Sequence, residues 1–108
     1  FSIFPGSELK LLKGLELGCS GIITATTNAT ATLARNVYDN YMNNKEQSLN
    51  QKLCDVRSAF DEYNLISGLH TFFGREKKYY KNILPPLRIL NEKDEKELFN
   101  KFKTLDFY

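Results

Sequence analysis

Two short apolar segments place the strongest constraint on how this chain can fold. Residues 1–4 alternate in polarity and residues 21–25 form a β-branched run, so both predict strands, the second of them buried on both faces. A helical pattern follows each, and a strand–helix–strand–helix order predicts parallel strands. Two parallel strands do not make a stable sheet on their own. We therefore expect them to pair with strands that the 108 residues do not contain.

Turn and capping residues delimit two helices in this first part. Pro5-Gly6 ends the first strand, and Ser7 is placed to cap a helix with a leucine stripe that stops at Gly18. Asn28 is a candidate cap for the second helix, whose apolar residues recur at helical spacing. The pattern predicts two strand–helix units.

From residue 46 onward the sequence predicts helices, one of which should run from Ile66 toward Tyr80. Pro85-Pro86 cannot lie inside a helix, so residues 83–90 should be extended, and Asn91 should cap the last helix. Helical periodicity also predicts a common buried set. It consists of Leu53, Val56, Phe60, Leu69, Phe73, Leu98, Phe102 and Leu105.

Charge and cysteine usage exclude several classes of protein. The net charge is +2 with acids and bases interleaved, so residues 75–81 are interpreted as a solvated helix face and not as a nucleic-acid site. No apolar run reaches the roughly 18 residues of a membrane helix. Cys19 and Cys54 have no metal-ligand spacing and predict free thiols in a reducing cytoplasm, with a disulfide as the alternative. No metal and no cofactor are predicted.

The order of motifs resembles one enzyme family. Residues 4–8, followed by residues 17–28, resemble the seventh and eighth βα units of the dihydrodipicolinate synthase and N-acetylneuraminate lyase family. In that family a loop with a glycine and an acidic residue ends strand seven. It is followed by a strand with the pattern Gly-x-x-Gly-[Val/Ile]-Ile-[Ser/Thr] and then by an asparagine. Pro85-Pro86-Leu87 resembles the segment before the last helix of many members. The start at Phe1, without a methionine or a signal pattern, predicts an internal point of a larger protein.

The resemblance implies an α/β fold: the C-terminal fragment of a (β/α)8 TIM barrel, followed by a helical bundle. Residues 1–44 would be the last two βα units, and residues 45–108 the bundle, so this chain would be mostly helical. The parent would be a pyruvate-dependent class I aldolase or lyase that forms or cleaves carbon–carbon bonds in 2-keto acids through a Schiff base. Its lysine would lie upstream of Phe1, so no catalytic residue is predicted here and the chain alone should be inactive. The rest of the barrel, or a homo-oligomer, would be its protein partner.

Six residues would contact substrate by the same resemblance. They are Gly6, Ser7, Glu8, Ile23 (through its carbonyl), Thr24 and Asn28. Three of them also have a purely structural interpretation. Glu8 suits the first turn of a helix, Asn28 suits a helix cap, and Thr24 suits a strand interior. His70 stands where members often have a lysine, and is interpreted as a surface or structural helix residue. A different class also stays open, a non-catalytic helical module that packs or oligomerises.

Overall fold

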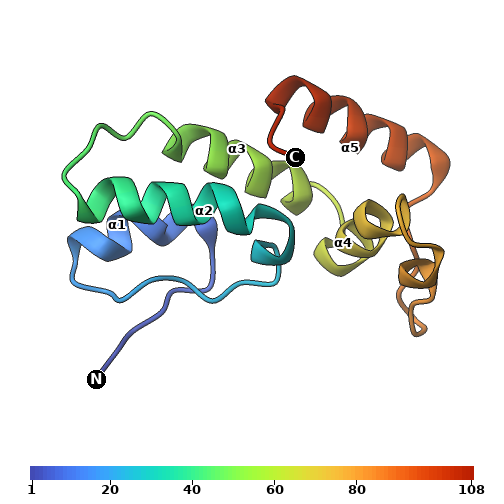
Figure 1. Cartoon of the computed structure of the whole chain (residues 1–108). Coiled ribbons are helices and arrows are strands. Elements are labelled where there is room, and N and C mark those ends of the chain that lie inside the picture. The colour runs from blue at the N-terminus through green and yellow to red at the C-terminus, as the bar shows by residue number, and fades with distance from the viewer.

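Five α-helices and two 3₁₀ turns are the regular elements of the chain, which the computed structural model describes from residue 1 to residue 108. In chain order they are η1 (Glu8–Lys10), α1 (Leu11–Glu16), α2 (Thr27–Met42), α3 (Asn50–Asp61), α4 (Leu65–Gly74), η2 (Lys78–Lys81) and α5 (Glu92–Leu105). Helix α3 packs against η1 and α2, and also against α4 and α5 (Figure 1). It therefore joins the two ends of an elongated molecule, 42 × 32 × 22 Å in extent.

The two predicted strands are extended segments that lie side by side, and the prediction of strands is wrong for this chain. Only two backbone hydrogen bonds join them: Ser20 N to Ile3 O at 2.9 Å and Ile23 N to Pro5 O at 3.2 Å. A regular ladder needs pairing on successive residues, and no third segment of the chain extends this pair. The expectation of burial on both faces also fails, because Ile23 is 70% exposed.

The start of α2 differs from the expected one by two residues. Thr26 is its N-cap, and Asn28 lies within its first turn, so the prediction of Asn28 as the cap is wrong. The reason is local. The Oγ1 atom of Thr24 accepts a hydrogen bond from the backbone N–H of Thr27 at 3.0 Å, so this N–H at the start of α2 needs no capping side chain. The caps at Ser7 and the helix stop at Gly18 (φ +90°) are confirmed.

Helix α4 stops earlier than predicted and the chain folds back on it. The helix ends at Gly74, and the extended residue Lys77 precedes η2, so a continuous helix toward Tyr80 is wrong. A β-carbon at Gly74 would lie only 2.7 Å from Cγ of Lys81, so the absence of a side chain lets η2 pack closely against α4. Residues 83–90 contain no helix, and the Asn91 cap of α5 is confirmed.

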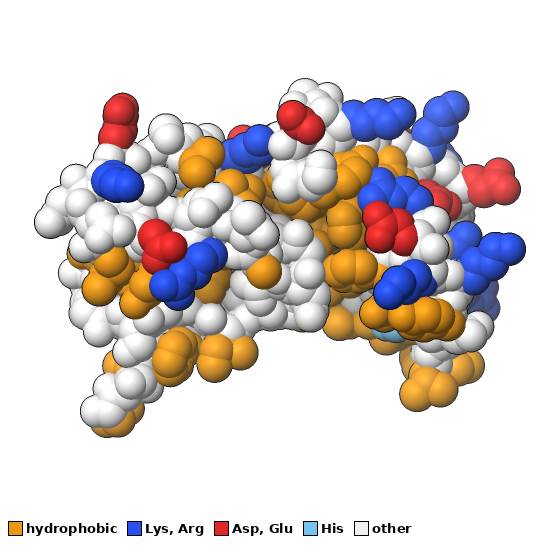
Figure 2. Space-filling model, viewed as in Figure 1, with side chains coloured by type: hydrophobic (Ala, Val, Ile, Leu, Met, Phe, Trp, Pro, Cys, Tyr) orange, Lys and Arg blue, Asp and Glu red, His pale blue; other side chains and the backbone are white.

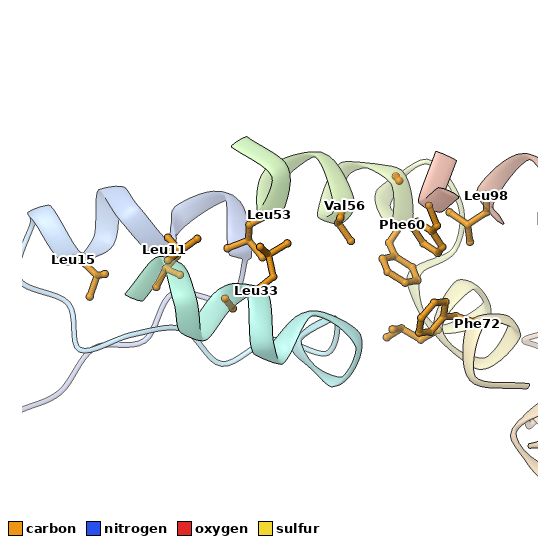
Figure 3. Close-up of a cluster of buried hydrophobic side chains, with 13 residues drawn as sticks. Leu11, Leu15, Leu33, Leu53, Val56, Phe60, Phe72 and Leu98 are labelled. Atoms are coloured by element: carbon orange, nitrogen blue, oxygen red, sulfur yellow. The ribbon is translucent and has the colours of Figure 1, made fainter. Parts of the chain in front are cut away.

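A single hydrophobic core runs the length of the molecule along α3 (Figure 3). The burial predicted from periodicity is confirmed for Leu53, Val56, Phe60, Leu69, Leu98 and Phe102. Phe73 and Leu105 are half-buried and pack on the edge of this core, so their assignment as buried is wrong. Phe72 is buried in their place, because its ring makes T-shaped contacts with Phe60 and Phe102.

Candidate functional site

A carboxylate with no solvent exposure lies at the start of η1. Glu8 is completely buried. Its Oε1 atom accepts a hydrogen bond from Nη1 of Arg57 on α3 at 2.9 Å, and its Oε2 atom accepts one from Oγ1 of Thr30 on α2 at 3.1 Å. Both oxygens therefore have partners, as an ionised group needs when it leaves water.

Threonine hydroxyls extend this ion pair into the loop that precedes α2. The Nη1 atom of Arg57 also donates to Oγ1 of Thr26 at 3.1 Å, and Thr26 shares a hydrogen bond of 3.2 Å with Thr24. On its other side Arg57 donates from Nε to Asp61 at 3.0 Å. One guanidinium thus connects α3 with η1 and with the end of the second extended segment.

The surroundings of this pair favour the charged forms. Burial raises the pKa of Glu8, but hydrogen bonds from the threonine hydroxyls and from Arg57 outweigh it and hold the pKa below its ordinary value. Burial lowers the pKa of Arg57, and the hydrogen bonds and charges of Asp61 and Glu8 raise it above its ordinary value. Both shifts favour the ionised forms, so Glu8 and Arg57 form an ion pair at neutral pH.

A cleft of about 520 Å³ opens where the second extended segment meets α4. Apolar side chains form most of its wall, and Asn28, His70 and Tyr80 supply its polar groups. Nδ1 of His70 lies 2.6 Å from the carbonyl oxygen of Tyr80, and Nδ2 of Asn28 donates to the carbonyl oxygen of Ala25 at 2.9 Å. A mostly apolar cleft with a few placed polar groups is typical of a small-molecule site.

Five of the six residues expected to bind substrate fall into three places. Gly6 and Ile23 adjoin each other, since a β-carbon at Gly6 would lie 4.0 Å from the carbonyl oxygen of Ile23. Glu8 and Thr24 belong to the Arg57 network, and Asn28 lines the cleft.

Ser7 accepts a hydrogen bond from the backbone N–H of Leu9 at 3.2 Å and so serves as a cap. The carbonyl of Ile23 receives no hydrogen bond within the chain. It is the one predicted backbone contact that stays open to a ligand.

Sequence reasoning missed the roles of Arg57 and His70. Arg57 stands between the buried residues Val56 and Phe60 on α3, which is a signal that a charge near the core needs a buried partner. His70 was expected to be a surface or structural helix residue; it is half-buried and contacts the carbonyl of Tyr80, and only its place on the wall of the cleft was not predicted. Its contact with Tyr80 depends on the fold-back of η2, which the sequence pattern did not predict.

Exposed apolar side chains surround the two extended segments and the turn at residues 83–90 (Figure 2). They include Phe1, Ile3, Phe4, Ile23 and Leu84. On the face shown in Figure 2, basic and acidic side chains are interspersed over the α4–α5 end. No helix of the structure is both long enough and apolar enough to cross a membrane.

Known proteins share this arrangement over nearly the whole chain. A 2-keto-3-deoxygluconate aldolase of Sulfolobus, solved in complex with D-KDPG, superposes with a TM-score of 0.83 over 96% of this chain and 37% of its own, at 18% identity. The N-acetylneuraminate lyase of Proteus mirabilis superposes with a TM-score of 0.78 over 95% of this chain and 36% of its own, at 20% identity. These likenesses show the fold of a part of TIM-barrel enzymes, and the mostly helical structure is consistent with a C-terminal part.

A curated relative and a family profile complete the comparison. The 2-dehydro-3-deoxy-D-gluconate/2-dehydro-3-deoxy-phosphogluconate aldolase of Picrophilus torridus is 29% identical over 90 residues, which is 81% of this chain and 34% of that enzyme. The chain thus spans about a third of the length of the relatives it matches. The profile of the dihydrodipicolinate synthetase family matches residues 1–105, and the chain belongs to that family.

Proposed function

We propose that this chain is the final part of a pyruvate-dependent aldolase or lyase that acts on 2-keto acids. Residues 1–44 supply the last two βα units of its barrel, and residues 45–108 form the helical bundle that follows. One observation carries the proposal: the cleft between Asn28 and His70 opens at the end of the second extended segment. Active sites of TIM barrels lie at the C-terminal ends of their strands.

The chain contributes a wall of the site and not its nucleophile. A Schiff-base mechanism requires a lysine in the pocket. Lys10 and Lys13 lie on η1 and α1, where both are exposed, and neither lines the cleft. We therefore propose that the lysine comes from residues outside this sequence and that the 108 residues alone are inactive.

The residues on this wall take different roles in the proposal. Gly6 leaves room beside the carbonyl of Ile23, so a substrate can approach the backbone there. Asn28 contacts substrate from the cleft, and Thr24 supports the strand end from the ion-pair network. Glu8 acts from its buried position by holding this network in place, and Ser7 by capping η1.

A chimera tests the proposal directly. Residues 1–105 replace the matching stretch of the Picrophilus aldolase, and cleavage of 2-dehydro-3-deoxy-D-gluconate is measured together with borohydride trapping of pyruvate. We expect a pyruvyl adduct on the host lysine and measurable cleavage. A folded chimera that traps pyruvate and cleaves nothing would refute this wall as part of an aldolase site. The isolated chain is the control and should give no adduct.

The exposed apolar residues favour a second candidate, an interaction module that pairs through its extended segments. Ile3 and Phe4 are 52% and 45% exposed, and the segments carry unpaired backbone groups. Sedimentation at several concentrations separates the candidates: association to a defined dimer or tetramer, with an inactive chimera, would support the module. In the first proposal the same surface is covered by the remainder of the barrel.

A further inference from the structure

No Asp, Glu, Lys or Arg side chain lines the cleft. Its wall consists of Ala25, Asn28, Ile66, Leu69, His70, Phe73 and Tyr80. The lysines of η2 are exposed and are not among these residues, and the stem of Lys81 lies against the backbone of Gly74. The selectivity of the cleft therefore depends on the hydrogen-bonding direction of its three polar side chains.

His70 is held in one tautomer by the backbone of η2. A carbonyl oxygen can only accept, so the nitrogen 2.6 Å from Tyr80 O, which is Nδ1, carries the proton. In the neutral imidazole the other nitrogen, Nε2, then keeps its lone pair. No group of the chain donates a hydrogen bond to Nε2.

Asn28 presents an acceptor by the same reasoning. Its Nδ2 atom donates to the carbonyl oxygen of Ala25 at 2.9 Å, which orients the amide. Its Oδ1 atom receives no hydrogen bond within the chain. Two lone-pair acceptors, beside the hydroxyl of Tyr80 on a mostly apolar wall, suit a ligand that brings hydroxyl groups.

We propose that this cleft holds the uncharged, hydroxylated carbon chain of the substrate, with Nε2 of His70 accepting a hydrogen bond from a ligand hydroxyl. The inference rests on the proposed function, which supplies the class of ligand. A phosphoryl group needs several donors or a cation, whereas this wall has no Lys or Arg; opposite the acceptors of His70 and Asn28, with only the hydroxyl of Tyr80 as a possible partner, the group would lose most of its hydration without compensation. The cleft thus selects the unphosphorylated substrate over its phosphate ester.

Two commercially available hydroxy acids that differ only in one phosphoryl group test this selection on the 108-residue chain. D-gluconate and 6-phospho-D-gluconate are titrated, and the ¹⁵N resonances of the His70 ring are followed by NMR. We expect gluconate to shift Nε2 while Nδ1 stays protonated, and phosphogluconate to bind no more tightly. An Nε2 resonance that gluconate leaves unmoved, or tighter binding of phosphogluconate, would overturn the proposal.

Two variants at the same position separate a ligand contact from a structural role. His70→Asn keeps an N–H near the position of Nδ1 and removes the acceptor, so gluconate binding should weaken about 2- to 10-fold. His70→Gln places an amide oxygen near the position of Nε2 and should bind more tightly than His70→Asn. Equal affinities in wild type, His70→Asn and His70→Gln would contradict the contact.

A third variant should reverse the preference. His70→Lys introduces a cation that pairs with phosphate, so phosphogluconate should then bind several-fold more tightly than gluconate. An unchanged preference for gluconate in this variant would contradict selection at residue 70. If the chimera is inactive but gluconate shifts the Nε2 resonance of His70, the proposed aldolase function is refuted and this inference is not. If the chimera is active but gluconate leaves the His70 resonance unmoved, only this inference is refuted.

Discussion

The two ends of α3 are held in the fold by different forces. From its N-terminus as far as Arg57, the helix contributes Leu53, Val56 and Arg57 itself, which meet the aliphatic residues of α1 and α2 (Figure 3) and the buried carboxylate of Glu8. Toward its C-terminus Phe60 enters a cluster of rings from α4 and α5. The ring centroid of Phe60 lies 4.9 Å from that of Phe102.

One short helix thus takes part in two kinds of contact, a buried ion pair and a cluster of aromatic rings. Aromatic contacts prefer certain ring arrangements, but contacts between phenylalanine rings involve no titratable group and so do not depend on pH. A buried ion pair is directional and depends on the charge of both partners. We therefore expect the aromatic end to provide most of the stability, and the ion-pair end to place the loops that border the cleft.

The largest effect should follow loss of the aromatic contact. Phe60→Ala and Phe102→Ala should each lower the free energy of unfolding by about 3–5 kcal/mol, because both residues are fully buried. Since their rings touch, the double variant should cost less than the sum of the two. Urea denaturation measures all three. Tyr79→Ala is the control, as Tyr79 is 60% exposed; a double variant as stable as wild type would show that the aromatic end is not a core.

Removal of the guanidinium tests the other end. Arg57→Met should lower the free energy of unfolding by about 3–5 kcal/mol, because Glu8 would remain as a buried charge without a counterion. Adding Glu8→Gln to this variant should recover part of the loss.

Arg35→Met is the matched control for Arg57→Met. Arg35 pairs with Asp39 at the same spacing as Arg57 and Asp61, but both partners are largely exposed, so the cost should stay below about 1 kcal/mol. Equal losses at Arg35 and Arg57 would remove the distinction between the two ends of α3.

Acid should affect the ion-pair end first. The pKa of Glu8 is lowered in the folded chain, so its contribution to stability is complete above the pKa of an unfolded glutamate, about 4.3, and is lost as pH falls through the lower folded value. Glu8→Gln should lack this component, and its stability should fall less steeply between these values. Thermal unfolding across the acid range measures both slopes, and identical slopes would contradict the assignment.

The helix caps should give the smallest effects and should also differ between the two ends. Asn91→Ala should cost about 1 kcal/mol, since its side chain accepts a 2.8 Å hydrogen bond from the N–H of Asp94 at the start of α5. Ser7→Ala should cost less, because its 3.2 Å bond serves only the short turn η1. Chemical denaturation ranks the two, and a larger loss at Ser7 would reverse the comparison.

Sequence patterns predicted the features that depend on near neighbours. The spacing of Leu53, Val56 and Phe60 is a local consequence of the helical period, and the cap at Asn91 needs only the residues that follow it. The choice between Phe72 and Phe73 could not be made this way, because adjacent aromatic residues fit one helical face almost equally well and only the packing of α5 decides between them.

The candidate site was harder to predict from the sequence, because its contacts join residues that are far apart in the chain. Glu8 and Arg57 are 49 positions apart, and no local pattern relates them. The resemblance correctly identified the family. It did not reveal the fold-back of η2, which brings Tyr80 to His70 and depends on the close packing at Gly74.

Gly74 has a consequence for how this protein can vary in evolution. An alanine there would push against the stem of Lys81 at 2.7 Å and displace the neighbouring carbonyl of Tyr80 that holds the His70 ring. The ring could then turn over and exchange its proton between the two nitrogens, and the cleft would offer a donor as readily as an acceptor. Under the proposed function, natural selection on substrate preference would thus act on residue 74, although this residue does not line the cleft.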